Sequence, residues 1–186
     1  MFPRMVCEVP TDVMEPTIKK GATIVADLSY YANNRPQRWD VVLFWAPELE
    51  EMGPSLGRSR IDARKCGAIA NAACDIFEHG MDVVLPGTTL RPHIFYVKRV
   101  VGLPGERLRF RSDSILLDGR PILVPPDLRG CYTRFERTDD YRFAAKEEYE
   151  IPEHHLFVLS DNLRSGKDSR EIGGVTMDNL FARVVA

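Results

Sequence analysis

Short apolar runs separated by turn residues dominate the chain and predict a mostly β protein. We expect strands at residues 22–28, 40–45, 93–101, 107–110, 114–117 and 156–159. These runs are rich in Val, Ile, Phe and Tyr, and their boundaries carry Gly, Pro, Asn and Asp, as is typical of strands and turns. Within residues 116–122, the pair Asp118-Gly119 predicts a tight two-residue hairpin turn.

One segment departs from the β pattern and predicts a helix over residues 57–80. Its apolar residues recur at spacings near three and four among charged residues: Ile61, Ile69, Ala72, Ala73, Ile76 and Phe77. Pro and Gly residues precede and follow the segment, so residues 46–92 are interpreted as a helical excursion from a sheet, or more plainly as a surface decoration. A second excursion, residues 106–150, opens with the predicted hairpin.

Size and charge bound the class of protein. At 186 residues, 44% of them apolar, the chain is long enough to bury a core in one domain, or in one domain with a large insert. Its 25 basic and 27 acidic residues nearly cancel, which argues against a nucleic-acid partner. No run approaches the eighteen or so apolar residues that a membrane span needs, and residues 1–10 are too short for a signal peptide, so the chain as given is expected to be soluble.

The cysteines give no sign of a metal site. Cys7, Cys66, Cys74 and Cys131 lack the CxxC spacing and the His neighbours of a zinc centre, and no metal is predicted. Cys66 and Cys74 would lie about 12 Å apart on the predicted helix, which is too far for a disulfide unless the helix breaks.

Three separated segments carry the most specific information. They occur in this order: Val-Pro-Thr-Asp-Val-Met-Glu-Pro-Thr-Ile at 9–18, Tyr-Val-Lys-Arg-Val-Val-Gly-Leu-Pro-Gly at 96–105, and Ser160-Asp161-Asn162 followed by Asp168-Ser169-Arg170 and Gly173. A strand-like run at 39–44, Trp-Asp-Val-Val-Leu-Phe, precedes the excursion. Together these segments resemble the sequence boxes of type I signal peptidases, which are Ser/Lys serine endopeptidases.

The resemblance implies a fold, a reaction and a location. The fold is a signal-peptidase-like antiparallel β-sheet catalytic domain, residues 1–105 and 151–186, with the helical excursion 46–92 and a smaller inserted β subdomain, residues 106–150. The family cleaves signal peptides from exported preproteins that carry small residues before the cleavage point. It works at the outer face of the cytoplasmic membrane or in the periplasm, where membrane association is expected, and it uses no cofactor.

Lys98 matches the position of the general base. In the family a serine hydroxyl attacks the scissile carbonyl while a neutral lysine takes its proton. Because an exposed lysine has a pKa of about 10.4, the amine has to be buried among apolar groups. Side chains alternate along a strand, so Tyr96, Lys98 and Val100 are expected on one face. The alternative is a surface lysine whose amine reaches water.

Val13 matches the position of the nucleophile and carries no hydroxyl. The nearby Thr11 and Thr17 already align with other family positions. Thr11 matches a serine whose hydroxyl joins the oxyanion hole, together with the backbone N–H of Val13. As a surrogate nucleophile on an extended strand, Thr11 would be displaced by about 6.6 Å from residue 13.

The third segment also departs from the family. The serine that orients the lysine falls on Gly166, Ser165 lies one place early, and the leading glycine of the box falls on Ser160. Asp168 and Arg170 resemble an ion pair that braces the site with Arg99, and the alternative is a solvated surface pair.

The remaining matches fall on substrate-binding and supporting positions. Val9, Pro10 and Val97 match positions that line the family's small apolar pockets, although ordinary core packing would also explain them. Supporting positions of the boxes are Met14, Pro16, Asp161, Asn162 and Ser169.

These residues favour a signal peptidase I-like protein that is impaired or inactive in peptide hydrolysis. The alternative is a non-catalytic binder that holds extended small-residue peptides as an added strand on the same fold. A self-cleaving module of repressor-type Ser/Lys proteins is disfavoured, because the chain has no DNA-binding helical region and no basic patch.

Overall fold

A computed structural model describes residues 4–45, 74–77, 80–83, 93–133, 135 and 148–186. The strands are β1 (Arg4–Val9), β2 (Ala22–Asp27), β3 (Val41–Trp45), β4 (Cys74–Phe77), β5 (Gly80–Val83), β6 (His93–Gly102), β7 (Arg107–Phe110), β8 (Ile115–Leu117), β9 (Arg120–Pro121), β10 (Tyr149–Glu150), β11 (His155–Leu159), β12 (Val175–Thr176) and β13 (Leu180–Val184). The helices are short: α1 (Tyr30–Asn33), α2 (Ser169–Ile172), η3 (Pro126–Leu128) and η5 (Met177–Asn179). The described chain is mostly β, as the sequence predicts.

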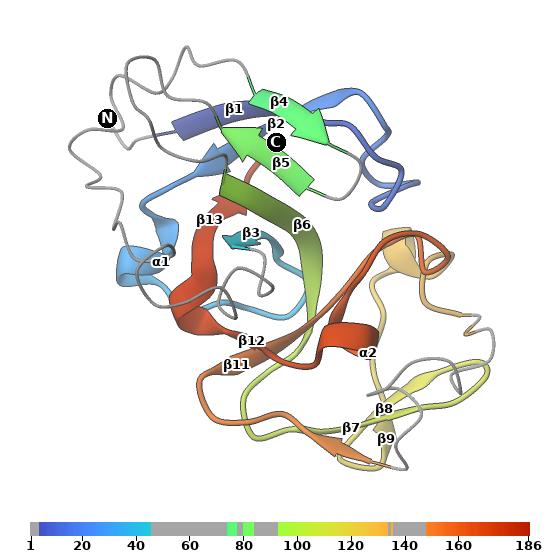
Figure 1. Cartoon of the computed structure of the whole chain (residues 1–186). Coiled ribbons are helices and arrows are strands. Elements are labelled where there is room, and N and C mark those ends of the chain that lie inside the picture. The colour runs from blue at the N-terminus through green and yellow to red at the C-terminus, as the bar shows by residue number, and fades with distance from the viewer. Residues whose placement is uncertain (1–3, 46–73, 78–79, 84–92, 134, 136–147) are drawn as a thin grey trace.

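The larger sheet runs in the order β1-β2-β13-β3-β6-β11-β12, and the β4–β5 hairpin joins it through β6. All of its pairs are antiparallel. In Figure 1 this sheet curls through the upper and middle parts of the molecule, with β6 crossing it from top to bottom. The sequence order of the strands is thoroughly mixed in the sheet, so segments from both ends of the chain meet beside β6.

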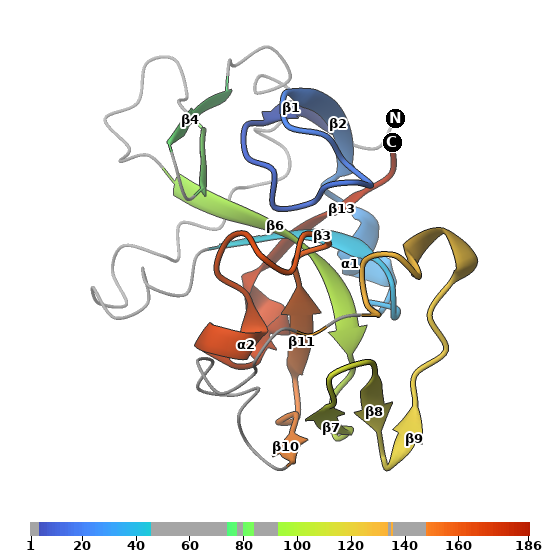
Figure 2. The ribbon, with the colours of Figure 1, turned by 90° about the vertical axis from the view of Figure 1, so that its right-hand side faces the viewer.

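A smaller sheet in the order β10-β7-β8-β9 is built from strands between residues 107 and 150. Figure 2 shows it below the larger sheet, separated from β1 and β2 by the length of β6. Leu117 pairs with Arg120, and both Asp118 (φ 48°) and Gly119 (φ 77°) adopt positive φ. This geometry confirms the predicted two-residue turn, which requires positive φ at both central residues.

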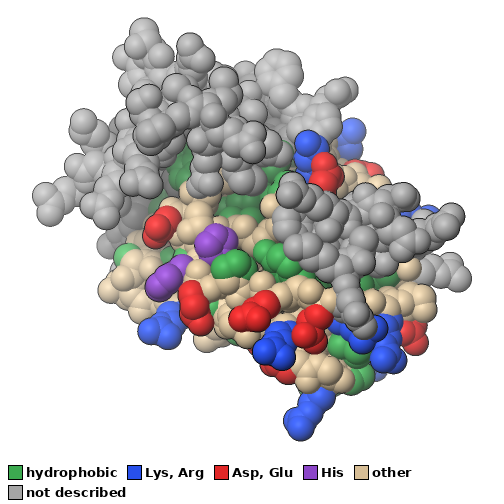
Figure 3. Space-filling model, turned by 60° about the horizontal axis from the view of Figure 1, so that its bottom comes forward, with side chains coloured by type: hydrophobic (Ala, Val, Ile, Leu, Met, Phe, Trp, Pro, Cys, Tyr) green, Lys and Arg blue, Asp and Glu red, His purple; other side chains and the backbone are tan. Residues whose placement is uncertain are grey.

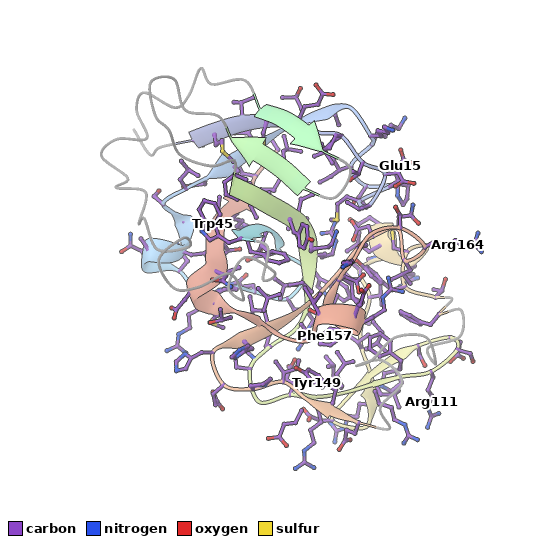
Figure 4. The ribbon with its side chains drawn as sticks, viewed as in Figure 1. Glu15, Trp45, Arg111, Tyr149, Phe157 and Arg164 are labelled. Carbon is purple, nitrogen blue, oxygen red and sulfur yellow. The ribbon has the colours of Figure 1, made fainter. Side chains whose placement is uncertain are left out.

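Strand β6 is the longest described strand and connects the parts of the fold. It pairs with β3 along residues 95–99, with β5 along 93–95, and with β11 near its C-terminal end. Phe157 of β11 packs against Tyr149 of β10 with ring centroids 5.5 Å apart, which ties the smaller sheet to the larger one (Figure 4). Residues on β6 are therefore held from several sides.

The surface mixes charge types. On the described part of the face in Figure 3, acidic and basic side chains lie among apolar and neutral ones. Neither sign of charge dominates that face, which agrees with the near-zero net charge of the sequence.

The six strands expected from sequence are all present, with ends that shift by at most one residue. The helix expected over residues 57–80 is wrong where it can be compared, because Cys74–Phe77 is strand β4, and residues 57–73 lie outside the described residues. The helical spacing assumed between Cys66 and Cys74 therefore does not apply. Ile76 and Phe77 belong to a β-hairpin that pairs with β6, so tertiary pairing overrides the helical periodicity.

Gly102 is the last residue of β6, and side chains pack closely against its Cα atom. A Cβ atom at this position would lie 2.3 Å from Ile151 Cδ1 and 3.0 Å from Phe157 Cβ. We predict that Gly102→Ala lowers the free energy of unfolding by about 1–3 kcal/mol, because two buried neighbours must move.

Gly130→Ala is the matched control, since nothing lies within 4 Å of a Cβ built there. Urea unfolding of both variants checks the prediction. Equal stability changes in the two variants would contradict the packing described at Gly102.

Candidate active site around Lys98

Lys98 lies in the middle of β6, opposite Val42 of β3, and its side chain is 3% exposed. Tyr96 and Val100 pack in one apolar cluster with Val42, whereas Val97 packs in a different cluster. The predicted alternation along β6 is therefore confirmed. The alternative of a surface lysine that reaches water is wrong, because Lys98 is buried.

Burial lowers the pKa of Lys98 to about 8. Removal from water penalises the charged amine, and the Arg170 guanidinium acts in the same direction, whereas the carboxylates of Asp168 and Asp161 act against it. The Lys98 Nζ also lies 5.7 Å from the centroid of the Tyr96 ring. A substantial fraction of the amine is thus neutral near pH 8, as a general base requires.

The chain turns sharply after β1. The N–H of Glu15 donates to the Asp12 carbonyl (3.0 Å) and the N–H of Ile18 donates to the Met14 carbonyl (2.8 Å). The expectation that Thr11 and Val13 share one face of an extended strand is therefore wrong, because Asp12 and Val13 already belong to the turn. Thr11 is half-buried and Val13 is buried.

Val13 and Lys98 approach the same point, next to Gly166. A Cβ atom built on Gly166 would lie 2.6 Å from Val13 Cγ1 and 3.5 Å from Lys98 Nζ. Residues from the first, second and third sequence segments thus converge although they are far apart along the chain. At this point of convergence, position 13 presents a methyl group to the neighbourhood of the amine.

A loop after β11, residues 160–166, holds the turn that carries Val13. The Asn162 N–H donates to the Val13 carbonyl (3.0 Å), and the Asn162 side chain donates to the Asp12 carbonyl (3.3 Å). The Ser165 hydroxyl donates to Asp12 Oδ1 (2.5 Å). Figure 4 labels Glu15 on the turn and Arg164 on the loop, both at the right-hand side of the view. Ser165 therefore serves this loop contact.

Arg99 and Asp161 form a buried ion pair. Arg99 Nε donates to Asp161 Oδ1 (2.8 Å) and Nη2 donates to Oδ2 (2.6 Å). The hydroxyls of Thr17 and Tyr132 donate to the two oxygens of the same carboxylate. The Asp161 carboxylate thus connects Thr17 of the turn after β1, Arg99 of β6 and Tyr132. Burial, followed by the charge of Asp161, raises the pKa of Tyr132 well above its usual value.

Tyr132 and Trp39 are contacts that sequence reasoning missed. Tyr132 lies outside the three segments and gives no local signal of its role. Trp39 adopts a φ of 76°, a conformation that favours glycine. Its carbonyl accepts a hydrogen bond from Arg99 (2.9 Å), and its ring packs 5.6 Å from that of Tyr132.

Asp168 and Arg170 form a second buried pair at the start of α2. Their side chains are 1% and 4% exposed, and two parallel hydrogen bonds of 2.9 Å join them. The alternative of a solvated surface pair is therefore wrong. Arg99, which was expected to share in this pair, bonds to Asp161 instead.

Helix α2 also fixes the end of β11. Asp168 Oδ2 accepts a hydrogen bond from the Ser160 N–H (3.0 Å), and the Ser169 hydroxyl accepts one from the Val158 N–H (2.9 Å). The Asp168 carboxylate also caps the helix by accepting from the Arg170 N–H (3.1 Å). These bonds satisfy backbone groups beside Lys98 that are removed from water.

The residues matched to substrate pockets lie in or beside one apolar cluster. Val9, Val97, Val13 and Met14 are buried together in it. Pro10 is half-buried and Pro16 is exposed. The cluster reaches position 13, so packing residues of the sheet also form the surroundings of the candidate site.

The described part of the chain contains no group of His, Cys, Asp or Glu side chains arranged to hold a metal ion. Cys7 and Cys131 are both buried, and Cys131 is a free thiol. No helix among the described residues is long and apolar enough to cross a membrane.

Comparisons with known proteins agree with the resemblance. The whole chain, residues 1–186, matches the family described as signal peptidase, peptidase S26. Signal peptidase I of Leptolyngbya laminosa is 24% identical over 178 residues, covering 95% of this chain and 64% of that protein. Signal peptidase I S of Bacillus subtilis is 32% identical over 99 residues, covering 50% of this chain and 49% of that protein. The chain thus spans between about half and two thirds of the length of these relatives.

A solved structure is also similar. The signal peptidase I structure from Enterococcus faecalis V583 matches 82% of this chain and 98% of that chain, at 20% identity and a TM-score of 0.47.

The lowered pKa of Lys98 predicts a pH-dependent cost to stability. Between about pH 8 and 10.5 the folded state binds fewer protons than the unfolded state. The free energy of unfolding of the wild type therefore increases as the pH rises through this range. Below pH 8 the cost is on the order of 3 kcal/mol, and above 10.5 it vanishes.

We therefore expect Lys98→Met to stabilise the protein, relative to wild type, more at pH 7.5 than at pH 10.5. Denaturant unfolding of both proteins at the two pH values measures the difference. A difference that does not change with pH would contradict the burial of the amine.

Removing the partner of a buried carboxylate should be costly. Arg99→Met leaves Asp161 charged and buried without its guanidinium, and we expect a loss of about 3–5 kcal/mol in the free energy of unfolding. Arg107→Met is the control, because Arg107 and Glu150 are 59% and 70% exposed and 4.0 Å apart. That variant should lose less than about 1 kcal/mol. Thermal unfolding of both variants decides the point, and similar losses would count against the Asp161 network.

Proposed function

Because the chain belongs to the signal peptidase family, peptidase S26, we propose that it is a signal peptidase I-like protein that accepts signal peptides but is impaired in cleaving them. The observation that carries this proposal is the meeting of Val13 and Lys98 beside Gly166. A buried amine with a pKa of about 8 is available as a base, while the side chain next to it has no proton to give.

The missing step is the attack on the peptide bond. In a serine variant at position 13, the hydroxyl oxygen would bond to the scissile carbonyl carbon, and the neutral Lys98 amine would take the hydroxyl proton. The carbonyl oxygen would become an oxyanion that the Val13 backbone N–H and the Thr11 hydroxyl stabilise. The ammonium would then return its proton to the leaving amine. Valine at position 13 removes the attacking hydroxyl, and without the attack none of the later events follows, although the base and the oxyanion-stabilising groups are retained.

Valine 13 and glycine 166 are proposed to be linked replacements. A Cβ atom at position 166 would come within 2.6 Å of Val13 Cγ1, closer than real Cβ contacts allow. The valine therefore occupies space that a side chain at position 166 would need. The hydroxyls expected from the family at positions 13 and 166 are both absent. Val13 disfavours a serine at position 166, because the two side chains would collide.

The proposed substrate is a preprotein segment with small residues before the cleavage point. Val9, Pro10 and Val97 would line the apolar surface that receives those residues, next to position 13. The protein would meet this substrate at the outer face of the cytoplasmic membrane or in the periplasm.

A non-catalytic peptide binder on the same fold is the second candidate. Among the described strands β1 pairs only with β2, so its other edge can receive an extended peptide as an added strand. In this case Val13 would serve as a permanent apolar contact for the bound peptide.

Peptide cleavage tests the proposal directly. Wild-type protein should not cleave an Ala-x-Ala peptide faster than Lys98→Ala does, and Val13→Ser should raise turnover by at least about 100-fold. The kcat/KM of Val13→Ser should increase with pH through about 8, because only the neutral amine accepts the proton. Wild-type cleavage clearly above the rate of the peptide without protein would contradict the proposed loss.

Calorimetry with an uncleaved signal-sequence peptide separates the two candidates from a structural remnant. Heat of binding in the wild type with restored turnover in Val13→Ser supports an impaired peptidase. Heat of binding without turnover in Val13→Ser supports the binder, and the absence of heat argues against both.

A further inference from the structure

The hydroxyl of Ser160 is buried next to the candidate site, and the proposed function gives it no role. Ser160 is 0% exposed, and its Oγ has no hydrogen-bond partner among the described residues. A buried hydroxyl without a partner costs stability, and such groups are uncommon in folded proteins. An explanation in terms of a nearby polar group is therefore needed.

The strand register places Ser160 beside Lys98. The pairing of β11 with β6 ends at Leu159 and Arg99, and continuing this antiparallel register by one residue sets Ser160 opposite Lys98. Directly opposed residues of an antiparallel pair point to the same face, with Cβ atoms about 4.5–5.5 Å apart. Val158 and Val100, one pair earlier on that face, pack in one cluster, which agrees with this arrangement.

The groups around the Lys98 amine limit which acceptors it can use. Its charged surroundings are Asp168 and Arg170 at the start of α2 and Asp161 after β11, with the Tyr96 ring on its own strand. Asp168 and Asp161 already bond to Arg170 and Arg99, respectively. The Ser160 oxygen is the neighbouring acceptor that remains free.

We propose that Ser160 is the positioning residue of Lys98, and that its hydroxyl accepts a hydrogen bond from the Lys98 amine. A hydroxyl rotates among its staggered positions at little cost, so the bond forms without movement of either strand. The Ser160 backbone is held in place by its N–H bond to Asp168. This inference rests on the proposed function, in which Lys98 is the base.

The orienting hydroxyl has thus moved within the third segment. The related box carries a serine at position 166 and a glycine at position 160, whereas this chain has Gly166 and Ser160. Ser165 does not substitute, because its hydroxyl donates to Asp12. The clash between Val13 and any side chain at position 166 explains why the hydroxyl is supplied from β11 instead.

The titration of Lys98 in the otherwise unaltered chain tests this inference. Protein labelled with 13C-lysine gives an Nζ titration from the Cε resonance, assigned by its loss in Lys98→Arg. Because the hydroxyl oxygen stabilises the charged amine, Ser160→Ala should lower the pKa of Lys98 by about one unit. Ser160→Cys, whose sulfur is a weaker acceptor, should lower it by less.

Ser169→Ala is the matched control. Ser169 is equally buried, but its hydroxyl bonds to the Val158 N–H rather than facing Lys98. This variant should lose stability without a comparable shift of Lys98. An unchanged or raised pKa in Ser160→Ala, or an equal shift in Ser169→Ala, would overturn the inference.

The outcome is independent of the cleavage experiment. The titration needs neither a substrate nor a nucleophile, so failure of Val13→Ser to cleave leaves the Ser160 result standing. Conversely, restored cleavage with no effect of Ser160 on Lys98 would overturn this inference alone.

Discussion

The structure depends on the burial of one amine in the middle of a strand. Lys98 is enclosed where β3, β6 and the residues after β11 meet, and its charged form is destabilised by loss of water. Two buried ion pairs and a capped helix surround it, and they keep the carboxylates of Asp161 and Asp168 paired. A protein gains little stability from such an arrangement, because paired buried charges are roughly neutral in net effect. The arrangement is therefore better explained by function than by folding.

In the proposed function, Val13 stands in these surroundings at the position of the nucleophile. Val13 packs in an apolar cluster with Val9, Val97 and Met14, so its methyl groups stabilise the turn that holds it. Gly166 and Val13 fit each other in size, and the proposed role of Ser160 supplies a hydroxyl to Lys98 from the end of β11. These three positions form a consistent set rather than isolated replacements. Conversion of the site therefore involves packing as well as chemistry.

Sequence patterns gave the fold class and the residues of the site, but only part of their arrangement. Strands rich in β-branched residues, such as β6 and β3, were predictable, whereas β1 was missed although its exposed positions alternate with buried Met5, Cys7 and Val9. Three segments identified Lys98, Asp161 and Val13 in advance. The contact of Tyr132 with Asp161 and the exclusion between Val13 and Gly166 depend on long-range packing, for which a single sequence contains no local signal.

The Lys98 amine is buried beside position 13 and is easily deprotonated. The pKa of Lys98 in the wild-type protein, read from the pH dependence of its 13Cε resonance, tests this most directly. We expect the midpoint of this titration near pH 8. A midpoint near the ordinary lysine value of about 10.4 would show an amine in contact with water and would contradict it.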